Sequence, residues 1–575
     1  MKIINFLKNK TLNANSILRI LSSWLIYGII YEIFGLQLIA MPFYIILLIF
    51  ILIFLILSLI SITIKKNNFD YYLLIILSLI LSNVWVYKSE NIHYILILFL
   101  LNYLIYKYKL KDINFKKTNK KISPKIIILF GLISFIIIST IGITRYLSFT
   151  APNFDLGIPS QMFYYMKKTG LPLTTCERNV LLSHFAIHFS PIYYLVLPLY
   201  FLFSSPITLQ ICSGLLVAIG IIPTYLLCKS HKLPNIVTVI ICFIYSIYAP
   251  AICSSYYDFH EIMFLLPLFL WLFYYYEKNN NILFTIFAIL ILLTKEDAAI
   301  YLMVFSVYMI FDNNKKKGFI TLISSIIYFV TVVSLINKYG EAVMTDRYYN
   351  LILTNTNSEM IEVFKTIITN PGYFIKQLIT SSNNSSNEKI YYYLKIFLPF
   401  GFCIFNTKKF KNYILLIPII YVTMTTYIYS YDINFQYSYP IYAFLFYLFI
   451  ISIDENKNYN YLFMCIVGST LVFSTYSLTK FVNEISNYDK FKDIYNEKRK
   501  FLDTIPDTAS VTANSFLIPY LSKRDELYEI NYHNFQNLTD YIVTDIDLNE
   551  YLNEEDINKY IIIDTYQEIH IYKKQ

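Results

Sequence analysis

Ionisable side chains beside apolar segments are the first candidates for chemistry in this chain. Only 15% of its 575 residues are charged. A charged group at membrane depth is costly, so the few that occur there usually bind or transform something. Four clusters of this kind occur, around Asp155, His184, Asp258 and Lys295.

Asp155 directly follows an apolar segment, in the sequence Asn153-Phe154-Asp155-Leu156-Gly157. A carboxylate held at a membrane surface can act as a general base toward the hydroxyl group of an acceptor. An aspartate in front of an apolar segment is also a common helix N-cap. Both roles remain open for Asp155.

His184 and His188 are spaced to lie on one face of a helix, where two imidazoles can bind a metal ion. Glutamate does not occur between them, so they do not form the zinc motif of metalloproteases. The alternative is a pair of interfacial histidines hydrogen-bonded to loop carbonyls.

The third cluster reads Asp258-Phe259-His260-Glu261. In an extended segment Asp258 and His260 lie on the same side, so both can point at one ligand. With Glu261 they offer the oxygen and imidazole donors that suit a divalent cation such as Mg or Mn. A solvated loop is the alternative.

The fourth cluster is Thr294-Lys295-Glu296-Asp297, between two short apolar runs. Lys295 can bind a phosphate as a point charge. Glu296 or Asp297 can join a metal site or pair with the lysine, and a hydrophilic turn is the alternative. A phosphate site, a divalent cation and a base together suit transfer from a phosphate-linked lipid donor.

The elements that must position these clusters are membrane helices. The chain is 57% hydrophobic and 18% aromatic, which excludes soluble, disordered and fibrous proteins. Uncharged runs such as 43–62, 126–144 and 318–336 approach or reach the ~20 residues that cross a bilayer. The composition therefore predicts a polytopic α-helical membrane protein.

Apolar runs predict about fifteen spans. They lie near 16–36, 40–63, 70–88, 91–107, 125–144, 206–228, 234–250, 261–277, 281–294, 297–312, 318–337, 391–405, 412–430, 437–452 and 460–480. The segment 183–204 has two prolines and two histidines, so we expect it as a helix lying at the outer interface.

Lysine and arginine favour the cytoplasmic side of a membrane. Eight basic residues between 107 and 125 make that loop cytoplasmic. The pattern predicts a cytoplasmic N-terminus, long outer loops at 145–205 and 338–390, and an outer C-terminal tail. All four clusters then lie on the outer side.

Residues 482–575 form an acidic tail with 10 Lys and Arg against 18 Asp and Glu, a net charge of −8. The overall charge of +9 therefore reflects +17 in residues 1–481, and is not a signal for nucleic acid. A charged helix near 486–503 and strands near 510–513, 540–544, 560–564 and 568–573 predict a small extracytoplasmic α/β domain with a mainly parallel sheet.

Several short motifs carry a family resemblance. They are Phe154-Asp155-Leu156-Gly157, His188-Phe189-Ser190-Pro191, Phe259-His260-Glu261, Lys295-Glu296-Asp297, Tyr437-Ser438-Tyr439-Pro440 and, in the tail, Leu521-Ser522-Lys523-Arg524. Over residues 125–575 the chain resembles a prokaryotic membrane protein family known as domain of unknown function 2079. Residues 1–124 are expected to be additional helices and a basic loop, and 125–481 the membrane core.

That family is similar to the GT-C superfamily of membrane glycosyltransferases, which use polyprenyl-phosphate sugars on the outer face of the membrane. The similarity implies that Asp155 is the catalytic acidic residue of the first outer loop. The second acidic motif of such enzymes, Asp-x-Asp, reads Asp258-Phe259-His260 here, so its second Asp is replaced. The residues implied to hold a divalent cation are Asp258, His260, Glu261 and Glu296. Those implied to bind phosphate or substrate are Lys295, Arg178, His184, His188 and Asp297.

The resemblance implies an inverting enzyme of the plasma membrane that moves a hexosyl or pentosyl group from the lipid-linked donor to a cell-envelope acceptor. Two alternatives stay open. A lipid or solute transporter or flippase should show inverted repeats and broken midplane helices, and the two halves of the sequence show no repeat. A non-catalytic envelope scaffold would use the tail to bind partners.

Overall fold

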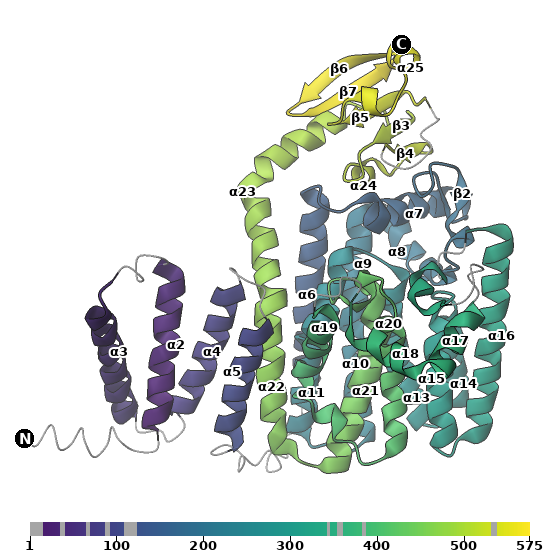
Figure 1. Cartoon of the computed structure of the whole chain (residues 1–575). Helices are drawn as coiled ribbons and strands as arrows, with labels where there is room; N and C mark the ends of the chain where they lie inside the picture. Colours follow the sequence, from purple (N-terminus) through teal and green to yellow (C-terminus); the bar gives the residue numbers. More distant parts are fainter. Residues whose placement is uncertain are drawn as a thin grey trace, which may run out of the picture.

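The computed structural model describes residues 15–34, 41–64, 69–86, 92–107, 123–341, 345–353, 360–381, 387–530 and 538–575. The predicted basic loop at 107–125 and the predicted cytoplasmic N-terminus fall mostly outside these residues. The described chain is a bundle of helices with a small β-sheet at one end (Figure 1).

Seven helices in the described residues are long and apolar enough to cross a membrane. They are Phe43–Ile64, Pro124–Leu147, Pro206–Ser230, Asn235–Tyr257, Lys315–Tyr339, Gln436–Asn456 and Tyr459–Leu502. Shorter apolar helices are Ser16–Tyr31, Phe69–Leu81, Ile92–Ile105, Asn281–Leu292, Ala298–Phe311 and Phe410–Thr423. The structure thus confirms a polytopic helical membrane protein, with fewer full-length spans than the fifteen apolar runs predict.

The first four helices stand at the side of the bundle, and the last two of them contact α22 (Leu462–Val472) (Figure 1). They are α2 (Ser16–Phe34), α3 (Phe43–Ile64), α4 (Phe69–Val86) and α5 (Ile92–Ile105). A buried ion pair of 3.3 Å between Arg19 Nε and Asp70 Oδ2 joins α2 to α4. A paired charge is the form in which ionisable side chains persist between membrane helices.

The main bundle contains α6 and most of the helices after it. They are α6 (Pro124–Leu147), α9 (Pro206–Ile219), α10 (Ile221–Ser230), α11 (Asn235–Ser246), α12 (Ala249–Cys253), α13 (Leu265–Glu277), α14 (Asn281–Leu292), α15 (Ala298–Phe311), α16 (Lys315–Tyr339), α19 (Glu388–Phe397), α20 (Ile417–Thr423), α21 (Tyr439–Asn456) and α22 (Leu462–Val472). Helix α21 is buried along most of its length. Aromatic rings fill its contact with α13, where Phe273 stacks on Tyr447 at 4.5 Å between ring centroids.

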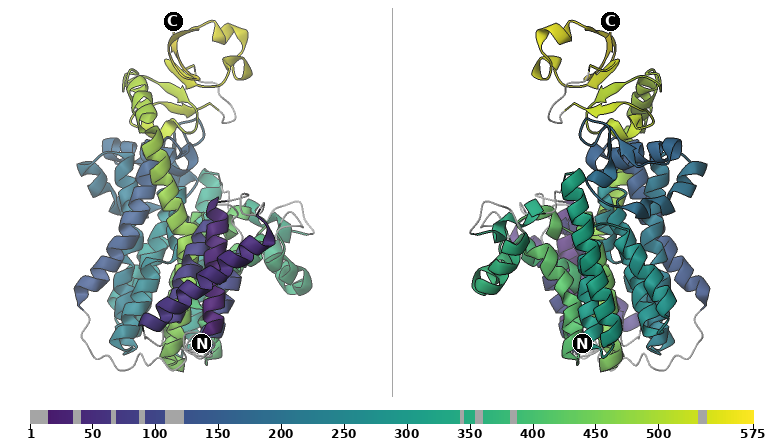
Figure 2. Two further views of the ribbon diagram at one scale, coloured as in Figure 1. Left: turned by 90° about the vertical axis from the view of Figure 1, so that its left-hand side faces the viewer. Right: turned by 90° about the vertical axis from the view of Figure 1, so that its right-hand side faces the viewer.

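Short elements cover one end of the bundle. They are α7 (Ile158–Thr169), β1 (Leu173–Thr174), β2 (Leu182–Ser183) and α8 (Leu197–Leu202). Helices α17 (Met360–Thr369) and α18 (Pro371–Ile379) from the later loop lie at the side of the bundle (Figures 1 and 2). The single interfacial helix predicted over 183–204 is wrong. Two 3₁₀ turns and the six-residue α8 replace it, because Pro191 and Pro198 each remove a backbone donor that a continuous helix needs.

Helix α23 (Thr479–Leu502) continues from α22 through a π-helical turn and carries the C-terminal domain away from the bundle (Figures 1 and 2). The sheet order is β4-β3-β5-β7-β6. The strands are β3 (Val511–Ala513), β4 (Leu527–Glu529), β5 (Tyr541–Thr544), β6 (Tyr560–Tyr566) and β7 (Ile569–Lys574), with helices α24 (Ile518–Leu521) and α25 (Glu554–Ile557).

The prediction of a mainly parallel sheet is wrong for half of the domain. Strand β3 is parallel to β4 and β5, whereas β7 is antiparallel to β5 and β6. The reason is the connection from β6 to β7, which is only two residues long. Such a loop makes a hairpin, and a parallel crossover needs a dozen residues or more.

The other end of the bundle gathers the loops that the lysine pattern predicts to be cytoplasmic. His231 lies 2.7 Å from Glu277 and 2.9 Å from Asp454, and Lys411 pairs with Asp312. These groups line a second cavity of about 420 Å³. Helix α16 begins beside it and ends at the segment between α6 and α9, where Glu341 N donates to Ala186 O.

Candidate active site

A cavity of about 490 Å³ lies at the end of the bundle that carries the C-terminal domain. Residues from 152–193, 257–261 and 427–437 surround it, together with Lys295 and Arg347. Most of the residues predicted to form the site line this cavity. They are Asp155, Arg178, His184, His188, His260, Glu261 and Lys295. The remaining three predicted residues, Asp258, Glu296 and Asp297, are buried outside its lining.

Asp155 sits in a π-helical turn, Asn153–Gly157, that precedes α7. Helix α7 has no side-chain cap, so the N-cap alternative for Asp155 is wrong. Its Oδ1 lies 3.8 Å from His260 Nε2. Burial, with a smaller effect of Asp258, raises the pKa of Asp155 well above its usual range, and burial lowers the pKa of His260. A carboxyl group with a raised pKa is a stronger base once it ionises.

Asp258 is fully buried and does not line the cavity. Its carboxylate accepts hydrogen bonds from Arg145 Nη2 at 3.3 Å and from Gln210 Nε2 at 2.5 Å. The prediction that Asp258 and His260 share one ligand is therefore wrong. Asp258 has a φ of 58°, so the segment is not extended there and the two side chains diverge.

Lys295 and Glu261 form an ion pair of 2.8 Å in the cavity wall. Tyr193 OH also donates to Glu261 Oε2 at 2.6 Å. Burial opposes both charges, but Lys295 lowers the pKa of Glu261 well below its usual range and Glu261 raises that of Lys295. Lys295 therefore faces the cavity as a cation that already has its anion.

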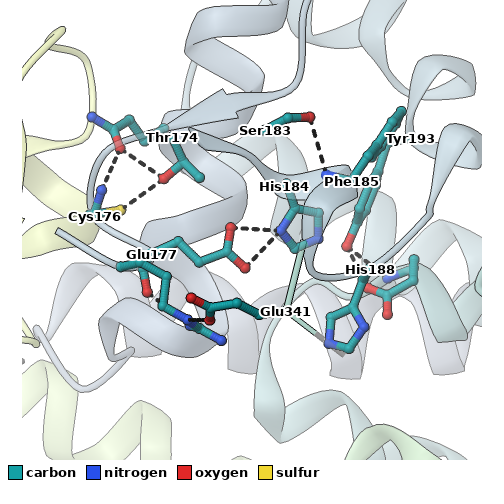
Figure 3. Close-up of polar contacts among 12 residues, drawn as sticks. Thr174, Cys176, Glu177, Ser183, His184, Phe185, His188, Tyr193 and Glu341 are labelled. Carbon is teal, nitrogen blue, oxygen red and sulfur yellow. Dashed lines mark hydrogen bonds and ion pairs between the residues drawn. The ribbon is translucent and has the colours of Figure 1, made fainter. Parts of the chain in front are cut away.

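His184 and His188 lie side by side, with ring centroids 6.0 Å apart (Figure 3). They share one face of a single helical turn, because His188 N donates to His184 O at 2.9 Å, although the 3₁₀ turn that begins at His184 ends after three residues. His184 Nδ1 is 3.0 Å from both carboxylate oxygens of Glu177 (Figure 3). His188 Nδ1 is 3.0 Å from Glu296 Oε1. The prediction that loop carbonyls are the partners of the two histidines is wrong, because both rings contact carboxylates instead.

These carboxylates give the two histidines different properties. Burial would lower the pKa of His184, but Glu177 outweighs it and the pKa rises. Burial and Lys295 lower the pKa of His188 despite Glu296. At neutral pH the first ring therefore favours the charged form more than the second.

The segment from Thr294 to Asp297 is buried, so the hydrophilic-turn alternative is wrong. Glu296 accepts from Phe189 N at 3.2 Å and contacts His188. Asp297 leads into α15, where burial raises its pKa to about 6. Glu296 and Asp297 are therefore buried residues that pack outside the cavity lining.

The four residues predicted to hold a divalent cation do not converge. Asp258 faces Arg145, Glu261 faces Lys295, and Glu296 faces His188. In the described part of the chain no three His, Cys, Asp or Glu side chains gather as a metal site. These residues do not fit a bound metal ion.

Arg347 is a cavity residue that the sequence interpretation missed. Its guanidinium lies over the rings of Tyr427 and Tyr437, at 5.3 and 4.7 Å from the centroids. Within the described residues it has no carboxylate at ion-pair distance. Arg178, by contrast, pairs with Glu341 at 2.8 Å. Arg347 is therefore the guanidinium most available to an anionic ligand.

Aromatic side chains form another part of the lining. The rings of Tyr257 and Phe435 stack with centroids 3.6 Å apart, and Tyr429 packs on Phe435 at 4.3 Å. Flat rings with hydroxyl edges offer both apolar faces and hydrogen-bonding groups. Such a surface suits a ligand with both kinds of surface, such as a sugar ring.

One sequence signal could have identified Arg347. The chain has only six arginines against 41 lysines, since Lys and Arg total 47. Arg178 and Arg347 line the cavity and Arg145 holds Asp258 beside it. In a lysine-rich chain, the few arginines mark places where a planar, permanently charged group is needed.

The comparison with sequence families gives one match. A family described as "Predicted membrane protein (DUF2079)" matches residues 145–569. The match covers the cavity, the bundle around it and the C-terminal domain, and leaves out α2 to α5. No curated protein matches the chain.

Proposed function

The chain belongs to the DUF2079 family of predicted membrane proteins, and we propose that it is a membrane glycosyltransferase that moves a sugar from a polyprenyl-phosphate donor to an acceptor hydroxyl group. One observation carries the proposal. A single cavity contains a buried carboxyl group next to an imidazole, an arginine that has no carboxylate partner among the described residues, and an aromatic wall.

Asp155 and His260 supply the base in this proposal. Asp155 in its ionised form accepts the proton of the acceptor hydroxyl, either directly or through His260. A raised pKa makes the carboxylate a better proton acceptor than a solvated one. The neutral imidazole of His260 can orient the hydroxyl group through Nε2, the ring nitrogen that lies 3.8 Å from Asp155.

Arg347 binds the donor phosphate in this proposal. We assign it this role in place of Lys295 and Arg178, because each of those cations already has a carboxylate partner. A guanidinium presents several N–H donors in a plane that matches phosphate oxygens. The two tyrosine rings keep it in place without neutralising its charge.

The reaction is a single displacement. The acceptor oxygen forms a bond to the anomeric carbon while the bond from that carbon to the phosphate oxygen breaks. The bonding electrons leave with the polyprenyl phosphate, whose charge Arg347 stabilises, and the acceptor proton moves to Asp155. Attack from the face opposite the leaving group inverts the anomeric centre.

A lipid-linked donor also suits the surface near the cavity. Helices α17 and α18 expose apolar side chains, among them Phe364, Ile368 and Ile375, and carry polar residues on their other faces. Amphipathic helices of this kind lie in the membrane interface. The donor would then reach the cavity from the lipid, with acceptor and membrane lipids as its further partners.

The transporter alternative is less well supported. Between the outer cavity and the second cavity, α13, α15 and α21 pack through aromatic rings such as Phe269, Phe273 and Phe444. These three rings are fully buried. A solute path usually has paired or hydrated polar groups at the membrane midplane. This packing favours a reaction at one end of the bundle.

The proposal is tested with purified full-length protein in nanodiscs and a panel of labelled polyprenyl-phosphate sugars. Transfer to envelope acceptors by the wild type, and its loss in Asp155→Asn, are the expected results. Asp564→Asn is the matched control, because this aspartate is exposed on β6, far from the cavity lining. If the wild type transfers none of the sugars, or Asp155→Asn transfers them undiminished, the proposal is wrong.

A further inference from the structure

The C-terminal sheet does not end in an open edge at β4. Leu527 N donates to Thr175 Oγ1 at 2.9 Å, and that hydroxyl donates to Leu527 O at 2.8 Å. Glu529 N donates to Asn179 Oδ1 at 2.9 Å, and Asn179 Nδ2 donates to Glu529 O at 2.8 Å. Two side chains of the first outer segment thus satisfy the backbone groups that a neighbouring strand would otherwise take.

The side chain of Glu529 reaches further, to the turn that contains Asp155. Its Oε2 accepts a hydrogen bond of 2.7 Å from Asn153 Nδ2. The same amide donates to Cys176 O at 2.8 Å. Both Asn153 and Glu529 are buried. The side-chain amide of Asn153 therefore connects the C-terminal domain to the two segments that contain Asp155 and Glu177.

Packing fixes the same turn from its other side. Ile158 and Cys176 belong to one apolar core with Ile518 and Leu527 of the C-terminal domain. At Gly157 a Cβ would lie 2.7 Å from Ile518 Cγ2 and 2.5 Å from Asn153 Oδ1. The turn therefore has no room to shift without moving the domain.

The charge of Glu529 is hard to explain as packing alone. Among the described residues its carboxylate meets no lysine or arginine, and its side chain makes one hydrogen bond, to Asn153. Burying a carboxylate that has one hydrogen bond and no cationic partner costs free energy, and an apolar side chain at this position would avoid that cost. A charge-assisted hydrogen bond is, however, stronger and more directional than contact between apolar groups.

We propose that Glu529 is a positioning residue: through Asn153 it fixes the turn 153–157 and so aims the Asp155 carboxyl group into the cavity. The C-terminal domain is then part of the candidate active site. This inference rests on the proposed function only for its effect on catalysis. Its structural part can be tested without any activity.

The structural test is hydrogen–deuterium exchange on the full-length protein in nanodiscs. Glu529→Ala removes the acceptor, so we expect amides at 153–158 to exchange about tenfold faster, with β3 and β5 unchanged. Glu529→Gln keeps an oxygen for Asn153 but loses the charge, so its exchange should lie between that of the wild type and that of Glu529→Ala. Glu526→Ala is the matched control, because Glu526 is exposed next to β4. Unchanged exchange at 153–158 in Glu529→Ala, or equal exchange in the Ala and Gln variants, would overturn the proposal.

The kinetic test separates positioning from general stability. If transfer is measurable, Glu529→Ala should lower kcat about tenfold with the donor KM nearly constant, and Glu529→Gln should lower kcat less, because it keeps the acceptor oxygen. A rise in KM without a change in kcat would overturn the positioning role. If the wild type shows no transfer, the proposed function fails, while the exchange experiment still decides whether Glu529 holds the turn.

Discussion

His260 Nε2 lies 3.8 Å from Asp155 Oδ1 at the cavity, and the surrounding protein disfavours the charged form of both groups. Burial is the main cause for each residue. A carboxyl group and a neutral imidazole at this distance can exchange a proton through a bound hydroxyl group. The same burial that suits Asp155 to base chemistry must also weaken the fold when the carboxyl ionises.

Replacing Asp155 by Asn should therefore stabilise the protein at neutral pH. The pKa of Asp155 is higher in the folded state than its usual value of 3.8. Its contribution to stability is complete below that value and is lost as the pH rises through the folded pKa. Asp155→Asn avoids this loss, so Tm should rise by about 1 °C for each kcal/mol regained, because the shift per kcal/mol falls as the length of the chain increases.

Thermal unfolding of the two proteins across pH checks this expectation. The Tm difference should be large at neutral pH and should shrink as the pH falls toward 3.8. Asp564→Asn, at an exposed position, should leave Tm unchanged. A lower Tm in Asp155→Asn would show that the ionised carboxylate has a stabilising partner.

The pH dependence of transfer should show Asp155 directly. The base must be ionised, so kcat/KM should rise with pH through the raised pKa of Asp155, above the usual range of a carboxyl group. Loss of a general base lowers the rate by about 10²–10⁴-fold, so Asp155→Asn should lose that factor and the acidic limb. An acidic limb that persists unchanged in the variant would assign the titration to another group.

The pair of Lys295 and Glu261 should behave as a structural unit. Both side chains are buried and 2.8 Å apart. Lys295→Met leaves an uncompensated buried carboxylate, so we expect a loss of about 3–5 kcal/mol in the free energy of unfolding. Adding Glu261→Gln removes that charge and should restore most of the stability.

Denaturant titration of the single and double variants measures this coupling. Lys500→Met is the control, because Lys500 pairs with Glu497 on an exposed helix surface. It should unfold like the wild type. Additive effects of the two substitutions would mean that Lys295 and Glu261 act independently, and Lys295 would again be a candidate for phosphate binding.

The clusters around Asp155, His188, His260 and Lys295 could be recognised from the sequence, because charged groups are rare in so apolar a chain. Their arrangement could not. The same-side placement of Asp258 and His260 assumes an extended backbone, and a φ of 58° at Asp258 removes it. Strand β4 has only three residues, all buried, so no alternation marks it as a strand.

The role of Arg347 could not be predicted from the sequence for a different reason. Its role depends on Tyr427 and Tyr437, which lie on another segment of the chain, and on the fact that other cations are already paired. Pairing of this kind is decided by tertiary packing. Likewise the buried hydrogen bond between Glu529 and Asn153 joins residues that are far apart in the sequence. The sequence alone therefore indicates a separate C-terminal domain and does not reveal the contact that β4 makes with the rest of the chain.

Arg347 should contribute more to donor binding than Arg178. A hydrogen bond to a charged group contributes about 1.5–3 kcal/mol, so Arg347→Gln should raise the donor KM by about 10–100-fold. Arg178→Gln should have a much smaller effect, because Arg178 already pairs with Glu341. Donor titrations and inhibition by inorganic phosphate compare the two variants. Equal effects would assign the phosphate to both arginines.

The side of the membrane that each cavity faces can be measured by cysteine labelling in intact cells. Asp564→Cys lies on the C-terminal domain and Lys409→Cys lies at the second cavity, and both positions are exposed. The native cysteines give little background, since six are buried and Cys403 is half-buried. A membrane-impermeant maleimide should label position 564 at once and position 409 only after permeabilisation, because basic loops favour the cytoplasm. The reverse pattern would place Asp155 on the cytoplasmic side, and the donor would then have to be used before it crosses the membrane.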